Sequence, residues 1–146
     1  MEKLKEFQVK SVKNNNNFKS TKITKSSDAY GVIKQFYFGD IDIFESFFIL
    51  LMNRSNQTVG YAKISQGGIA GTVVDVKIIA KYCIDTLCSG VILAHNHPSG
   101  SLVPSEADKK ITKKIKDGLN LIDVQVLDHI ILTEDNYYSF GDNGLI

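Results

Sequence analysis

The chain has 146 residues, 43% of them hydrophobic and 23% charged, which is ordinary for a soluble globular protein and enough for one domain with its own core. No segment approaches the length of a membrane span, and the N-terminus lacks the apolar run of a signal peptide. The two cysteines, Cys83 and Cys88, lie on one predicted helix with a spacing unsuited to a disulfide within it, so a reduced cytoplasmic setting is expected.

The net charge of +1 conceals an asymmetry along the chain. Residues 1–25 contain seven lysines and two glutamates and carry +5, whereas the remainder carries −4. We expect residues 1–23 to be a flexible basic arm and residues 24–146 to form the folded domain. The basic segment is interpreted first as a solvated tail, with weak contact to nucleic acid through residues 1–25 as the alternative.

Hydrophobic periodicity along the body predicts an α/β domain, with a mixed, curved sheet of about six strands flanked by about three helices. The longest unbroken apolar run, at residues 46–52, is typical of a strand buried on both faces. The predicted order is a helix at 29–38, a turn at 40–44, strands at 46–52, 58–65 and 71–74, a helix at 76–87, a strand at 91–94, a helix beginning at Pro104-Ser105, and strands at 124–133 and 137–140.

Two of the three histidines flank one asparagine, as His95-Asn96-His97, directly after a predicted strand. Side chains two residues apart there can point to the same side, so both imidazoles can reach one metal ion. Asp108 follows eleven residues after His97, in the first turn of a predicted helix. Two imidazoles and a carboxylate form a three-ligand set that leaves the fourth position of a zinc ion open for water, the arrangement of catalytic zinc.

Such a site also needs a proton acceptor and a group that stabilises negative charge on a carbonyl oxygen. Glu45, at the polar start of a buried strand, is the best candidate for the general base. Ser105 is placed to donate a hydrogen bond to an oxyanion. An ordinary exposed carboxylate at Glu45 is the alternative for that residue.

These residues resemble the RadC-like proteins, bacterial members of the JAB/MPN family whose metalloprotease-type members carry the JAMM motif. The motif is a distal Glu, then His-x-His, seven residues, Ser, two residues and Asp, and here residues 98–104 supply the seven. The resemblance spans about residues 24–146 and includes Leu127-Asp128-His129 and Tyr138-Ser139-Phe140. The chain is similar to the short form that lacks an N-terminal helix-hairpin-helix region.

The resemblance implies a cytidine-deaminase-like JAB/MPN fold, with zinc bound by His95, His97 and Asp108. It also implies peptidase-like or isopeptidase-like hydrolysis, with Ser105 at the oxyanion and Glu45 as the distal Glu. Some RadC sequences carry a Glu shortly before the glycine that matches Gly67, where this chain has Ala62 and Lys63. The family name connects these proteins with DNA repair, which a hydrolytic mechanism does not by itself explain.

Several alternatives stay open at this point. Ser105-x-x-Asp108 also resembles a helix capping box. The letters His-Asn-His differ from HNH nucleases, in which the three residues are dispersed, and a single His2Asp zinc lacks the second metal that phosphodiester cleavage usually uses. The main rival to a hydrolase is a non-catalytic zinc module that binds DNA or protein.

His129 is expected to pack with Asp128 as its hydrogen-bond partner, or else to support the metal site.

Overall fold

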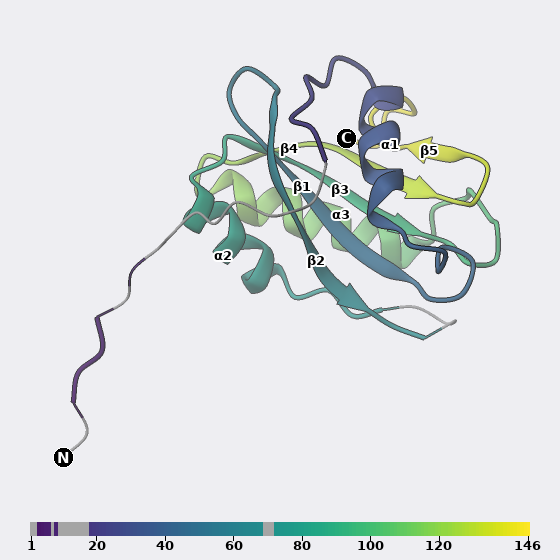
Figure 1. The fold of residues 1–146 in the computed structure, drawn as a ribbon. Coiled ribbons are helices and arrows are strands. Elements are labelled where there is room, and N and C mark those ends of the chain that lie inside the picture. The colour runs from purple at the N-terminus through teal and green to yellow at the C-terminus, as the bar shows by residue number, and fades with distance from the viewer. Residues whose placement is uncertain (1–2, 7, 9–17, 69–71) are drawn as a thin grey trace.

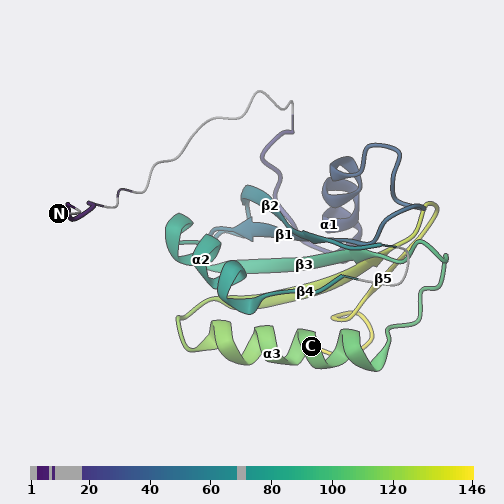
Figure 2. The same cartoon turned by 90° about the horizontal axis from the view of Figure 1, so that it is seen from below.

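Five strands form one mixed sheet in the order β2-β1-β3-β4-β5, with helices on both faces (Figures 1 and 2). The computed structural model describes residues 3–6, 8, 18–68 and 72–146. In chain order the elements are α1 (Ser26–Ile33), the short 3-10 helix η1 (Lys34–Phe36), β1 (Ser46–Met52), β2 (Thr58–Gln66), α2 (Val76–Thr86), β3 (Gly90–Asn96), α3 (Glu106–Asn120), β4 (Gln125–Leu132) and β5 (Tyr137–Ser139). The predicted α/β class and single mixed sheet are confirmed, but the sheet has five strands within the described residues where about six were expected.

Strand β1 divides the hydrophobic core into two layers. All seven of its residues are buried, and alternate side chains point to opposite faces of the sheet. Phe47, Ile49 and Leu51 pack on the α2 and α3 side, whereas Phe48 and Leu50 pack on the α1 side. The apolar run predicted to be buried on both faces is therefore buried on both faces.

Strands β3 and β4 are the parallel pair, and α3 is the crossover between them. A parallel pair needs such a long connection, usually a helix. Figure 2 shows α3 lying along the sheet on the face opposite α1. Ile115 and Leu119 of α3 are completely buried against this face, and burial of such side chains contributes roughly 1.5–3 kcal/mol each. The start of α3 is consequently held beneath the C-terminal end of β3.

Several expected elements differ in the structure; the helix expected at 29–38, for example, is α1 followed by η1. Of the strand expected at 71–74, residues 72–74 form no strand, and Gly71 lies outside the described residues. Val73 is 89% exposed, and the segment leads directly into Asp75, the N-cap of α2. Helix α2 ends at Thr86, since Leu87 adopts a left-handed conformation with φ of 51°. Cys88 therefore lies beyond the helix, and both cysteines are free, buried thiols.

Residues 18–22 lie against the domain. Lys22 forms a β-bridge with Gln57, and the N–H of Thr58 donates to the carbonyl of Thr21 at 2.9 Å. Most of the predicted basic arm, at residues 1–2, 7 and 9–17, lies outside the described residues, so its boundary stays a prediction. No helix within the described ranges has both the length and the apolar character needed to span a bilayer.

Candidate metal centre

His95 and His97 meet at the C-terminal end of β3, in the middle of the sheet. The strand runs through Asn96, two residues past the predicted end, because His95 pairs with Phe47 of β1 and Ile131 of β4. Alternation along the strand then places both imidazoles on the same side. Their Nε2 atoms lie 3.0 Å apart.

Asp108 reaches the two imidazoles from the first turn of α3. Its Oδ1 lies 3.3 Å from His95 Nε2, and its Oδ2 lies 3.2 Å from His97 Nε2. Ser105 is the N-cap of the helix: its Oγ accepts from the Asp108 N–H at 3.0 Å, and Asp108 Oδ2 accepts from the Ser105 N–H at 2.8 Å. Asp108 therefore takes part in the capping box and contacts both histidines at the same time. Its Oδ2 accepts from the Ser105 N–H and lies near His97, whereas its Oδ1 lies near His95.

Glu45 approaches the same point from the residue before β1. Ligand atoms of Glu45, His95 and His97 all lie within 4.8 Å of one another, so these residues form a group that could hold a metal ion. The Asp108 oxygens lie closer to both Nε2 atoms than that limit. Asp108 is not part of that mutual group, but it contacts both of its histidines, so the predicted ligands His95, His97 and Asp108 and the predicted base Glu45 lie close together.

The protonation pattern of His97 fits a cation at this point. Its Nδ1 lies 2.8 Å from the carbonyl oxygen of Ser101, which can only accept a hydrogen bond, so Nδ1 carries the hydrogen. In the neutral ring Nε2 then presents a lone pair toward His95 Nε2 and an Asp108 oxygen. Electron pairs so placed repel one another unless a proton or a metal ion lies between them. The donor set of two imidazoles and a carboxylate is the kind that zinc prefers.

The electrostatics of the metal-free cluster also favour a positive charge. A hydrogen bond with Asp108 raises the pKa of His97, against the opposing effect of burial. Burial alone would raise the pKa of Asp108, but hydrogen bonds with His95 and His97 outweigh it and hold that pKa below its ordinary range. Both shifts favour a positive charge at His97 beside the Asp108 carboxylate, which is the sign of charge that a bound metal ion would also supply.

We expect the stability of the metal-free protein to depend on pH through this pair. The raised pKa of His97 gives stabilisation that is complete below its ordinary pKa of 6.5 and is lost as pH rises through the folded-state value. The lowered pKa of Asp108 gives stabilisation present above 3.8 and lost as pH falls through the folded-state value. In the presence of a metal chelator, the unfolding free energy of the wild type should exceed that of His97→Gln by about 1–3 kcal/mol. This difference should be largest between pH 3.8 and pH 6.5. Denaturant unfolding from pH 4 to 8.5 measures it, and a difference that is constant with pH would contradict it.

Asn96, whose role the sequence analysis missed, holds the segment that carries Glu45. Its side chain is completely buried on the opposite face from the histidines. Nδ2 donates to the carbonyls of Ile41 at 2.6 Å and Phe44 at 2.7 Å, and Oδ1 accepts from the Ser46 N–H at 2.8 Å. Bonds on both sides of Glu45 thus fix its backbone. From the sequence, the position of Asn96 between two histidines on a strand predicts only that its side chain points away from theirs. It does not predict the bonds to residues 41, 44 and 46, which are 50–55 positions away in the chain.

Replacing Asn96 by alanine should lower the free energy of unfolding by about 2–3 kcal/mol, because three backbone groups lose a buried partner. Asn143→Ala is the matched control, since that exposed asparagine makes a single bond to the carbonyl of Ser139 and should cost about 0.5 kcal/mol or less. Denaturant unfolding of both variants measures the difference. Equal losses of unfolding free energy in the two variants would mean that the three Asn96 hydrogen bonds stabilise the fold no more than the single bond of the exposed Asn143.

His129 is buried in the sheet with Asp128 as a hydrogen-bond partner, as expected, but the bond is made by the backbone of His129 and not by its ring. Asp128 Oδ1 accepts from the backbone N–H of His129, while its Oδ2 accepts from the Ser139 hydroxyl. The ring lies on the other face of the sheet, with its Nε2 2.7 Å from His95 Nδ1. Strand alternation separates neighbouring side chains, so adjacency in sequence was a misleading signal.

An open hollow of about 570 Å³ lies over the cluster. Glu45, His97, Ser105 and Asp108 line it together with small apolar and hydroxyl side chains, including Val73, Val103, Ser99 and Ser101. Among the described residues, no lysine or arginine lines it. The hollow therefore offers hydrogen bonds and apolar contact close to the cluster but no cationic clamp.

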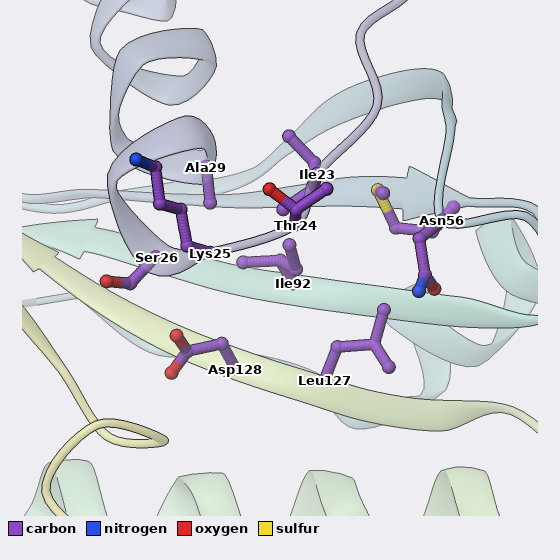
Figure 3. A pocket seen from close by; sticks show the side chains of 10 residues that line it. Ile23, Thr24, Lys25, Ser26, Ala29, Asn56, Ile92, Leu127 and Asp128 are labelled. Carbon is purple, nitrogen blue, oxygen red and sulfur yellow. The ribbon is translucent and has the colours of Figure 1, made fainter.

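A second, smaller cavity of about 180 Å³ lies on the α1 side of the sheet (Figure 3). Ile92 and Asp128, paired in adjacent strands, form its floor, and Lys25 and Ser26 lie at the start of α1. None of the four potential metal ligands lines it. This cavity is thus separate from the candidate metal centre.

Comparison with known proteins places this geometry in a family. A family model described as "RadC-like JAB domain" matches residues 23–145. A UPF0758 protein of Flavobacterium johnsoniae is 50% identical over 127 residues, covering 87% of this chain and 55% of that protein. Another from Porphyromonas gingivalis is 38% identical over 125 residues, covering 85% and 54%. The UPF0758 protein YfjY of Escherichia coli is 39% identical over 102 residues, covering 70% and 64%.

The chain spans about half the length of the first two relatives, so their similarity concerns this domain. The matched region contains the whole sheet, α3 and the cluster of His95, His97, Asp108 and Glu45. The chain belongs to the RadC-like JAB domain family.

Proposed function

We propose that this domain is a zinc-dependent hydrolase that cleaves a peptide or isopeptide amide bond. The observation that carries the proposal is the convergence of His95 Nε2, His97 Nε2 and the Asp108 carboxylate within 3.0–3.3 Å, with a ligand atom of Glu45 within 4.8 Å of those of the two histidines. The likeness to JAB domains, some of which are metalloproteases, supports the same reaction class. Free buried thiols are consistent with a reducing, cytoplasmic setting.

His95, His97 and Asp108 are the proposed zinc ligands. The Asp108 oxygens lie 3.2–3.3 Å from the two Nε2 atoms and form ion-pair contacts with both rings, which favours Asp108 over Glu45 as the third ligand. When bound, zinc supplies a Lewis acid that acidifies water and polarises a carbonyl. Three protein ligands leave room for such chemistry, as in other catalytic zinc sites.

Glu45 and Ser105 supply the remaining chemistry in this proposal. Glu45 accepts a proton from the attacking water as the C–O bond forms, and it returns that proton to the amine as the C–N bond breaks. The Ser105 hydroxyl accepts from the Asp108 N–H, so its own hydrogen is free of that bond and can donate to the carbonyl oxygen as negative charge develops. The Asn96 bonds on either side of Glu45 hold the base in place.

The lining of the hollow favours an amide over a phosphodiester. Cleavage of phosphodiesters usually uses a second metal ion or cationic side chains around the phosphate. The described lining offers neither a lysine nor an arginine, but it does offer serines and valines that can contact a peptide.

Metal analysis together with a hydrolysis assay tests the proposal. Purified protein should contain about one zinc ion per chain. It should release new amino groups from a peptide library that contains both main-chain and lysine-linked amide bonds. A zinc chelator should stop the release, and added zinc should restore it. Stoichiometric zinc without hydrolysis of either bond type would reject the hydrolase and favour the non-catalytic binding module.

A further inference from the structure

A buried line of hydrogen bonds runs from His95 into α3, behind the candidate metal centre. His95 Nδ1 lies 2.7 Å from His129 Nε2, and His129 Nδ1 lies 2.6 Å from Thr112 Oγ1. Thr112 Oγ1 in turn donates to the backbone carbonyl of Asp108 at 2.6 Å. None of the three residues is more than 3% exposed, so the line is closed to solvent.

The carbonyl at the end fixes the direction of every bond in the line. A carbonyl only accepts, so the single hydroxyl hydrogen of Thr112 is committed to Asp108. Toward His129 the hydroxyl oxygen must therefore accept, which places the hydrogen of His129 on Nδ1. A neutral His129 then accepts at Nε2, and the remaining hydrogen must lie on His95 Nδ1.

Two further observations support this order. His129 is completely buried, and its two ring nitrogens face the Thr112 hydroxyl and the His95 imidazole rather than a carboxylate, which favours the neutral ring with a single N–H. The Phe47 ring stacks on His95 with an interplanar angle of 7°, and the Phe140 ring stacks on His129 at 21°, so neighbours hold both ring planes.

We propose that Thr112 and His129 are positioning residues that hold His95 in the Nδ1–H tautomer, with the Nε2 lone pair directed at the metal position. The inference rests on the proposed function in that zinc is taken as the ion. Asp108 contributes at both ends of this arrangement, with its carboxylate at the metal position and its carbonyl at the end of the line. His97 gains the same tautomer from a loop carbonyl at Ser101 instead.

Nuclear magnetic resonance of the histidine rings tests the tautomers directly. The chain has only three histidines, so ¹⁵N-labelling of histidine gives three ring systems in the full-length protein. In both zinc-free and zinc-loaded protein, His129 should show the hydrogen on Nδ1 and an unprotonated Nε2. A hydrogen on His129 Nε2 would reverse the line and overturn the proposal. Because the zinc-free protein suffices, this outcome is independent of whether the protein hydrolyses amides.

Zinc affinity of Thr112 variants supplies the second readout. Thr112→Val removes the hydroxyl and should weaken zinc binding about 10–100-fold, the usual effect of losing a partner of a ligand. Thr112→Ser keeps the hydroxyl and should stay close to wild type. Thr133→Val is the matched control, because that buried threonine bonds only within the turn before β5. Unchanged affinity in Thr112→Val, or equal weakening in all three variants, would overturn the proposal; circular dichroism confirms folding.

Discussion

Replacing His97 by alanine is expected to remove zinc from the protein as purified. Zinc sites contribute roughly 10–16 kcal/mol of binding free energy, so one ligand of three or four accounts for about 3–4 kcal/mol, or roughly 10²–10³-fold in affinity. The two remaining ligands, His95 and Asp108, would then have to hold the ion with Glu45. Elemental analysis and competition with a zinc-binding dye measure the effect.

A pair of variants separates metal binding from helix capping at the start of α3. Asp108→Asn keeps an oxygen that can accept from the Ser105 N–H, but it loses the negative charge, so zinc affinity should fall while the helix stays capped. Ser105→Ala removes the partner of the Asp108 N–H and should cost about 1 kcal/mol of stability with zinc retained. Stoichiometric zinc in both His97→Ala and Asp108→Asn would reject this ligand set.

The features that the sequence predicted well are those with a local cause. The burial of β1 on both faces, the spacing of His95 and His97, and the capping residue Ser105 all follow from neighbouring residues. The end of α2 was placed too late because Leu87, an unusual residue for a left-handed cap, gave no glycine signal.

The features that the sequence could not predict depend on strand register. His129 reaches His95 because Leu93 pairs with His129 across the parallel β3 and β4. The irregularity in that register, between Val91 and Ile92, has no signature in the residues themselves. Thr112 likewise became part of the site only through the packing of α3 on β4. The ligands were thus predictable, whereas the residues that hold them were not.

Glu45→Gln is expected to reduce amide hydrolysis about 10²–10⁴-fold, the range for loss of a general base, while zinc content stays near wild type. The glutamine side chain has the same shape as that of glutamate. The Asn96 hydrogen bonds to Phe44 and Ser46 should still hold the backbone at residue 45. The glutamine amide cannot accept the proton of the attacking water. Glu106→Gln is the matched control, because Glu106 is an exposed carboxylate nearby on α3 that pairs with Lys109 and does not line the hollow.

The zinc content of Glu45→Gln decides which role this carboxylate has. Its distance from His95 and His97 suits either a metal ligand or a base that acts on water beside the metal. Lost hydrolysis with retained zinc would assign Glu45 as the base and Asp108 as the third ligand. Lost zinc would place Glu45 among the ligands and contradict the proposed mechanism. Full hydrolysis in Glu45→Gln would require the base to be another residue, and no carboxylate lies at Ala62 or Lys63, the other place where related sequences carry one.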